Sequence, residues 1–154
     1  MSKPKIQVAR LNPNQHIQYW NAVEIMQNTL GSVCPAVYDL YPQVENASRT
    51  FVALNDSQKV VGGLLWKYYE KPKIVDLKFM AVDPELHGQG IGRALESALV
   101  KHTKQCIANG AEIKGITLDA NHTNYIFYRK LGYSFVGPRP KVEICGPIEM
   151  MKGF

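Results

Sequence analysis

One segment near the middle of the chain constrains the fold more than any other, the stretch VDLKFMAVDPELHGQGIGRALESAL at positions 75–99. Its first seven residues largely alternate between apolar and polar side chains, which predicts a β-strand with one buried face. Asp83-Pro84 ends the strand, because proline fixes φ and lacks an amide hydrogen. Three glycines at alternate positions then lead into apolar residues at helical spacing. The segment therefore predicts a strand, a glycine-rich turn and an amphipathic helix.

The glycines precede the helix, where backbone N–H groups of the first turn have no intrahelical partner and the helix dipole is positive. Because glycine lacks a Cβ, an anion can approach these groups closely, and phosphate or pyrophosphate is the expected guest. Arg93, in the same turn, would add positive charge. Two common phosphate motifs do not fit. The dinucleotide pattern lacks its third glycine, and no Lys-Ser/Thr pair follows Gly92 as a Walker A sequence requires.

Together with the strand end Val82-Asp83-Pro84, the run HGQGIG at 87–92 resembles the acetyl-CoA pyrophosphate loop of the GNAT superfamily of N-acyltransferases. The family pattern is Arg/Gln-x-x-Gly-x-Gly/Ala, and this chain has His87 in the first slot. An imidazole can still donate to a phosphate oxygen, and its titration makes the expected affinity pH-sensitive. A second run, NHTNYIFYRKLGY at 121–133, resembles the family's Asn-x-x-Ala-x-x-Phe-Tyr-x-Lys-Leu-Gly-Phe, with Asn124 where alanine is usual.

The resemblance covers nearly the whole chain and implies a single domain over residues 1–154, a length typical of one domain. It implies an α+β GNAT fold, a mixed, mostly antiparallel sheet of six or seven strands with helices on both faces. The predicted strands 74–82 and 113–119 are parallel in that fold and splay apart to admit the pantetheine arm. The residues implied to bind acetyl-CoA are Met80, Ala81, Val82, His87, Gly88, Gln89, Gly90, Ile91, Gly92, Arg93, Asn121 and Tyr128.

The implied reaction is acetyl transfer from acetyl-CoA to a primary amine, by direct attack in a ternary complex. An alkylammonium, with a pKa of about 10, must first lose a proton, so a general base is required. Asp76 lies six residues before Val82, where several family members carry a glutamate. It would take this proton, or it would merely orient the amine or have no role. Tyr128 occupies the family's tyrosine position and would protonate the departing sulfur, with packing on the sheet as the alternative. Asn121 would bind the pantetheine or cap the short helix that follows.

The segment 31–48 is broken by two prolines, and in GNAT proteins the corresponding region overhangs the acceptor. Tyr38, Asp39 and Tyr41 are therefore candidate acceptor-binding residues. An ordinary covering helix whose tyrosines pack inward is an equally good interpretation. The loop 137–147 either covers the acceptor site or joins a dimer contact, and the sequence does not decide between these roles.

Two local patterns predict where a helix begins and where a strand is irregular in the N-terminal half. Asn12-Pro13 fits a helix N-cap followed by proline at the first helical position, with the helix running from about 14 to 30. Gly62-Gly63, inside the predicted strand 60–69, indicates a bulge or a close approach by another backbone.

Composition excludes several classes of protein. A hydrophobic content of 45% with no apolar run of transmembrane length, and no secretory signal, predicts a cytoplasmic protein without a membrane partner. Three widely spaced cysteines indicate reduced thiols. The net charge of +5 is scattered without a basic helix face, so no nucleic-acid partner is expected.

His102 and Cys106 are four residues apart, a spacing found in metal sites, but no second pair accompanies them and no metal is expected. The oligomeric state is open, although dimers are common in the family. The main functional alternative to an enzyme is a non-catalytic acyl-CoA-binding sensor or regulatory module, which would share the loop but have no acceptor turnover.

Overall fold

A computed structural model of the protein describes residues 5–32, 34–137 and 147–154. These residues form seven strands, three α-helices and three 3₁₀ helices. The strands are β1 (Gln7–Arg10), β2 (Thr50–Leu54), β3 (Val60–Tyr69), β4 (Ile74–Val82), β5 (Gly115–Ala120), β6 (Ser134–Phe135) and β7 (Ile148–Gly153). The α-helices are α1 (His16–Leu30), α2 (Ile91–Ala108) and α3 (Tyr125–Lys130). The 3₁₀ helices are η1 (Pro35–Leu40), η2 (Val44–Arg49) and η3 (Pro84–Leu86).

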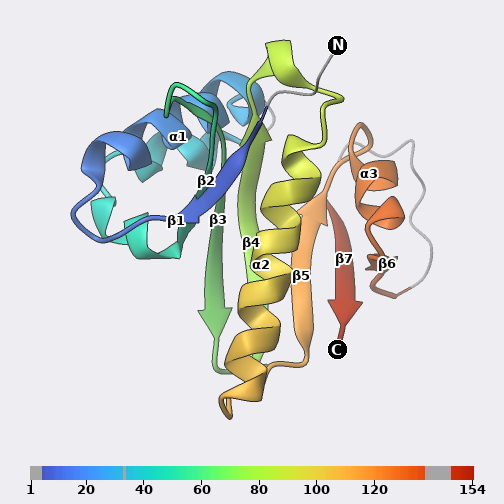
Figure 1. Cartoon of the computed structure of the whole chain (residues 1–154). Coiled ribbons are helices and arrows are strands. Elements are labelled where there is room, and N and C mark those ends of the chain that lie inside the picture. The colour runs from blue at the N-terminus through green and yellow to red at the C-terminus, as the bar shows by residue number, and fades with distance from the viewer. Residues whose placement is uncertain (1–4, 33, 138–146) are drawn as a thin grey trace. The chain divides into compact units, whose positions relative to one another are not determined.

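The strands form one mixed sheet in the order β1-β2-β3-β4-β5-β7-β6 (Figure 1). β2 pairs antiparallel with β1 and β3, and β7 pairs antiparallel with β5 and β6. β4 and β5 are parallel through three registered pairs, from Val75 opposite Ile116 to Leu77 opposite Leu118. The predicted α+β class and the mixed, mostly antiparallel sheet are therefore confirmed.

The chain divides into two compact units by its internal contacts. The first comprises Met1–Trp66 and Phe79–His102, and the second comprises Lys67–Lys78 and Thr103–Phe154. The division falls within β3, β4 and α2, so each of these three elements contributes residues to both units.

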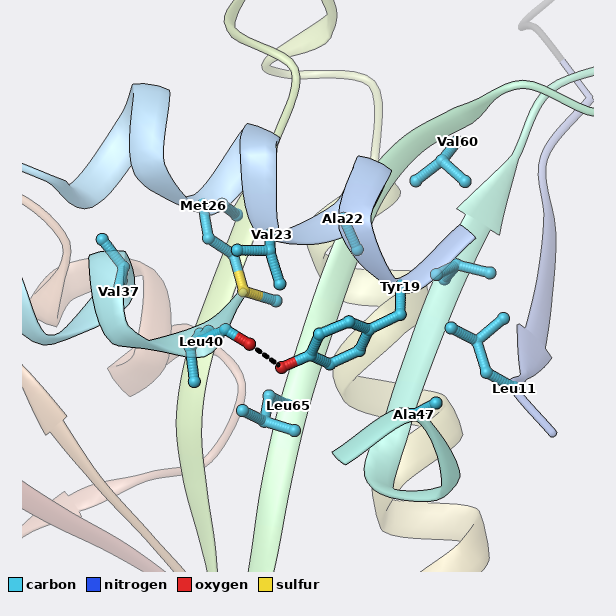
Figure 2. Packing of buried hydrophobic residues seen from close by; sticks show 12 residues of the cluster. Leu11, Tyr19, Ala22, Val23, Met26, Val37, Leu40, Ala47, Val60 and Leu65 are labelled. Carbon is cyan, nitrogen blue, oxygen red and sulfur yellow. Dashed lines mark hydrogen bonds between the residues drawn. The ribbon is translucent and has the colours of Figure 1, made fainter. Parts of the chain in front are cut away.

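The core of the first unit forms against α1 (Figure 2). One side of α1 is buried, and Tyr19 on that side is only 1% exposed. The Tyr19 hydroxyl donates to the Leu40 carbonyl at 2.8 Å, which ties η1 to the helix (Figure 2). The cluster consists of Leu11, Tyr19, Ala22, Val23, Met26, Val37, Leu40, Ala47, Val52, Val60, Leu65 and Ala81.

Gly62 and Gly63 show that helices cover both faces of β3. Successive residues of a strand point to opposite faces. A Cβ added at Gly62 would lie 3.2 Å from Leu95 of α2, whereas one at Gly63 would lie 2.8 Å from Ala22 of α1. The ladder with β2 also shifts here and leaves Val61 unpaired. The predicted bulge is therefore present, and so is the predicted close approach of another backbone, because the Ala81 carbonyl oxygen of β4 would lie 3.2 Å from a Cβ at Gly62.

The start of α1 differs from the prediction. The helix begins at His16, and Gln15 precedes it as the N-cap residue without a side-chain cap. Asn12 instead forms a turn with Gln15, whose N–H donates to the Asn12 carbonyl at 3.0 Å and whose Oε1 accepts from the Asn12 N–H at 2.6 Å. The predicted N-cap at Asn12 was wrong, because the N–H and the carbonyl oxygen of Asn12 both bond to Gln15 in this turn and the helix begins only after it.

No helix in the described parts of the chain is long and apolar enough to span a membrane.

Candidate active site

β4 leads directly into the loop that the sequence predicts to bind phosphate (Figure 1). The Asp83 carboxylate accepts a hydrogen bond from the Glu85 N–H at 3.0 Å and begins η3. The Asp83 N–H donates to the Val61 carbonyl at 2.9 Å. The bulge in β3 therefore supplies the acceptor that holds the C-terminal end of β4 in place.

Gly88 and Gly90 have φ angles of +81° and +82°, a left-handed conformation that glycine adopts without strain. A Cβ added to either residue would meet nothing within 4 Å among the described residues, so this backbone faces open space. α2 begins next, with the Ala94 N–H donating to the Gly90 carbonyl at 3.0 Å. The N–H groups before Ala94 have no partner within the helix. These N–H groups are therefore candidates to bind a phosphate group.

His87 is exposed, and its Nε2 lies 3.0 Å from the Val82 carbonyl oxygen. Because a carbonyl only accepts, this contact requires a hydrogen on Nε2. A neutral ring then has an acceptor at Nδ1, whereas a protonated ring has a second donor there. The predicted donation to phosphate is therefore compatible with this contact only when His87 is protonated.

The other residues predicted to bind the cofactor in the first unit differ in exposure. Met80 and Val82 are half-buried, whereas Ala81 is buried. Ile91 is 2% exposed and belongs to the core, so only its backbone is available to a ligand. Gln89 and Arg93 are exposed, and Gly92 is half-buried.

Asp76 belongs to the second unit, where it is opposite Thr117 in the parallel ladder. The Thr117 hydroxyl donates to Oδ1 of Asp76 at 2.7 Å. The Lys78 ammonium lies 3.0 Å from Oδ2, and the Asp76 side chain is 22% exposed. Both carboxylate oxygens are thus held by neighbours, one by a hydroxyl and one by a cation.

Lys78 also lies above an aromatic ring, with its Nζ 4.9 Å from the centre of Tyr69. Partial burial acts to lower the pKa of Lys78, but hydrogen bonds to Tyr69 and Asp76, with the charge of Asp76, together raise it above its ordinary value. Lys78 is therefore a cation at neutral pH.

A cavity of about 380 Å³ opens beside these residues, and every residue that lines it belongs to the second unit. Its charged and polar lining residues are Asp76, Lys78, Thr117, Asp119 and Glu149, with Tyr69 as the aromatic wall. Asp119 is directly opposite Glu149 in the β5–β7 ladder. Three carboxylates against one ammonium make the lining suitable for a cationic amine. Of these lining residues, the sequence predicted only Asp76 as a site residue, because the register of the strands decides which other residues line the cavity beside it.

Asn121 and Tyr128 also belong to the second unit. The Asn121 Oδ1 accepts hydrogen bonds from the N–H groups of Thr123 at 2.9 Å and Asn124 at 3.0 Å, so its oxygen supports the turn before α3. Its Nδ2 forms no hydrogen bond with the residues described. Tyr128 is 5% exposed and its ring makes an edge contact with Phe127, at 5.1 Å between centroids.

The candidate acceptor residues Tyr38, Asp39 and Tyr41 lie on or beside η1, and all three are exposed. Tyr38 is 57% exposed and Tyr41 is 38% exposed, whereas Val37 and Leu40 are the buried residues of this segment. The inward packing considered for the two tyrosines is therefore wrong. Their role in acceptor binding stays a prediction.

Two further predictions concern metals and the long C-terminal loop. Within residues 5–32, 34–137 and 147–154, no group of three His, Cys, Asp or Glu side chains could hold a metal ion. The His102 ring instead packs against Trp66, with 5.2 Å between the ring centroids. The loop predicted to cover the acceptor or join a dimer falls mostly on residues 138–146, outside the described residues.

Comparison with known proteins identifies the family. Residues 46–135 match the family model described as the acetyltransferase (GNAT) domain. No curated protein gives a significant match in sequence. The PaiA N-acetyltransferase of Thermoplasma acidophilum, solved with coenzyme A, superposes with a TM-score of 0.72 at 16% identity, over 97% of this chain and 99% of that one.

Two other solved structures are similar over the same extent, 97% of this chain and 99% of theirs. A GNAT-family acetyltransferase of Staphylococcus aureus has a TM-score of 0.72 at 19% identity. A chain of the NatC complex, solved with a Gag peptide and CoA, has a TM-score of 0.76 at 13% identity. At these identities the structures establish the fold alone, whereas the family match covers more than half of the sequence. The chain belongs to the GNAT family of acetyltransferases.

Proposed function

We propose that the protein is an N-acetyltransferase that transfers the acetyl group of acetyl-CoA to a primary amine by direct attack in a ternary complex. Membership of the GNAT family supports the acyltransferase class, and the relatives solved with CoA support acetyl-CoA as the cosubstrate. One observation carries the assignment of an amine acceptor. A carboxylate held by a buried hydroxyl, Asp76, lines a cavity whose charged residues are mostly acidic.

In this proposal the loop after β4 binds the pyrophosphate. The backbone at Gly88 and Gly90 fits such a group, because neither residue has a Cβ and an added Cβ would face open space. His87 and Arg93 would add charge, and backbone groups of Met80, Ala81 and Val82 would pair with the pantetheine arm. The Asn121 Nδ2 is also available for that arm. When bound, acetyl-CoA supplies an activated thioester and a sulfur that departs as a thiolate.

The acidic cavity would attract the acceptor as an ammonium ion, with Asp119 and Glu149 adding to the negative potential. Asp76 would then take the proton that the amine must lose, directly or through water. Thr117 would keep Oδ1 in a fixed orientation, so that Oδ2 would take the proton once the acceptor displaces Lys78 from it. The Tyr128 hydroxyl would hold a proton for the departing sulfur, a contribution of roughly 10²–10⁴ in rate for a positioned acid.

Asp76→Asn tests the base. An amide cannot take a proton from the amine, so the variant is expected to lose the acidic limb of the kcat/KM pH profile. Asp56→Asn, an exposed turn residue of the β2–β3 hairpin, is the matched control and should keep that limb. An acidic limb unchanged in Asp76→Asn would mean that another group takes the proton.

Tyr128→Phe tests the acid, since it removes one hydroxyl and keeps a ring that is almost fully buried. It is expected to lower kcat while the Kd of acetyl-CoA, measured by calorimetry, stays the same. Tyr125→Phe, in the same helix, controls for loss of a tyrosine hydroxyl from α3. Normal turnover in Tyr128→Phe would remove this residue from the mechanism.

A further inference from the structure

The cavity proposed for the acceptor is lined by a primary amine of the chain itself. The Lys78 Nζ is 3.0 Å from Oδ2 of Asp76, the oxygen assigned above to take a proton from the acceptor. It also lies 4.9 Å from the centre of the Tyr69 ring, which forms one wall of the same cavity. A lysine ammonium has the same chemistry as the alkylammonium group of an acceptor. Lys78 therefore already makes the contact that the proposed reaction requires of its substrate.

The position of Lys78 along β4 adds a second argument. Asp76, Lys78 and Met80 are alternate residues of one strand, so their side chains lie on the same face. Met80 begins the stretch of backbone proposed above to pair with the pantetheine arm. In the order of residues along β4, Lys78 thus falls between Asp76, the proposed base, and Met80.

We propose that Lys78 is a self-acetylation site, whose Nζ takes the acetyl group of acetyl-CoA when no amine acceptor is bound. This inference rests on the function proposed above. The bond between Nζ and the acetyl carbon forms while the carbon–sulfur bond of the thioester breaks. The ammonium gives up two protons, one through Asp76 to solvent and one to the departing sulfur. The products are N-acetylated Lys78, the thiol of CoA and one released proton.

Self-acetylation would change the cavity itself. The amide formed on Lys78 carries no charge, so Asp76 would lose the cation that now contacts its Oδ2. The cavity would then be lined by three carboxylates and no ammonium. An added acceptor amine would compete with Lys78 in the unmodified protein, because both must give a proton to Asp76. Amine acceptors should therefore slow the modification of Lys78.

The chain provides two matched lysines for a test within one spectrum. The Lys67 ammonium lies over the same Tyr69 ring, at 5.1 Å, but contacts no carboxylate in the described structure. Lys73 pairs with a carboxylate, that of Glu112, but does not line the cavity. Comparison with Lys67 therefore tests the contribution of Asp76, and comparison with Lys73 tests that of the cavity.

The experiment incubates the full chain with acetyl-CoA, without amine, and follows acetylation of each lysine by peptide mass spectrometry. We expect Lys78 to be modified at least about tenfold faster than Lys67 and Lys73, since a positioned base contributes at least that much. The rate per molecule should not depend on protein concentration. The preference should disappear in Asp76→Asn and in urea-unfolded protein. Equal rates at the three lysines, or a preference that survives in Asp76→Asn, would overturn the inference.

Acetic anhydride gives a readout that needs no bound acetyl-CoA. Lys78 is ion-paired with Asp76, whereas Lys67 contacts no carboxylate among the described residues, so this small reagent should modify Lys78 more slowly than Lys67. We therefore expect Lys78 to be modified faster than Lys67 by acetyl-CoA, and Lys67 faster than Lys78 by acetic anhydride. The same order with both donors would show that ordinary chemical reactivity decides the site, which would overturn the inference.

Amine turnover measured in the same samples separates this inference from the proposed function. Release of CoA on addition of an amine, with Lys78 unmodified when the amine is absent, would overturn the inference and leave the function standing. Neither reaction, in protein that calorimetry shows to bind acetyl-CoA, would overturn both.

Discussion

Thr117→Val is the substitution that most directly tests how the candidate base is held. Valine has nearly the shape of threonine but lacks the hydroxyl that donates to Oδ1 of Asp76 at 2.7 Å. A hydrogen bond to a charged group contributes about 1.5–3 kcal/mol. Because the Asp76 side chain is 22% exposed, solvent screens part of this interaction, and we expect a loss of about 1–2 kcal/mol.

If this interaction acts fully in the transition state, the loss corresponds to a fall of about 5- to 30-fold in kcat/KM. The assay is CoA release under subsaturating amine, with acetyl-CoA saturating. Thr117→Ser keeps the hydroxyl and should retain most of the activity. Thermal unfolding of both variants, monitored by circular dichroism, checks that the sheet persists. Unchanged kcat/KM in Thr117→Val would refute the claim that Thr117 orients a functional carboxylate.

Two further predictions concern stability. Gly63→Val places a branched side chain where even a Cβ would lie 2.8 Å from Ala22, so we expect the free energy of urea unfolding to fall by about 1–3 kcal/mol. The control Gly153→Ala adds a Cβ that meets nothing within 4 Å and should leave this free energy nearly unchanged. Equal losses in the two variants would contradict this account. Burial, and then the charge of Arg10, lower the pKa of His102 below its ordinary value near 6.5, so its neutral form is favoured in the folded state. Below pH 6.5 the unfolded chain binds a proton at His102 more readily than the folded protein does. The folded protein is therefore fully stable in this respect above pH 6.5 and loses stability as the pH falls from there through the folded-state pKa. His102→Gln should therefore lose less stability than the parent between pH 7.5 and pH 5.5, and equal losses would show that another group controls this range.

The segment 75–99 was the most predictable part of the fold, because strand alternation, a proline and positive-φ glycines all act within a few residues. Gly88 and Gly90 have the left-handed conformation that a glycine-rich turn requires, and the apolar face of α2 follows directly. The helix start at Asn12 was wrong because a local turn competed with the cap. Short-range patterns cannot decide between two such hydrogen-bonding arrangements.

The surroundings of Asp76 could not be predicted from sequence. Thr117 is 41 residues away along the chain, and only the register of the parallel pair β4–β5 brings its hydroxyl to Asp76. A shift of one residue in that register would place Thr117 on the other face. Lys78 could have been noticed, since residues two apart on a strand share a face. The outward position of Tyr38 could not, because the 3₁₀ geometry of η1 decides which side chains reach the core.

The measurement that tests the central claim most directly is CoA release from acetyl-CoA across a panel of primary amines, followed by chromatography. Acetyl-CoA binding is measured by calorimetry on the same protein, and Asp76→Asn is assayed beside it. The account predicts turnover with at least one class of amine, depressed in Asp76→Asn. Binding of acetyl-CoA without turnover of any amine would contradict it and favour the non-catalytic acyl-CoA-binding module.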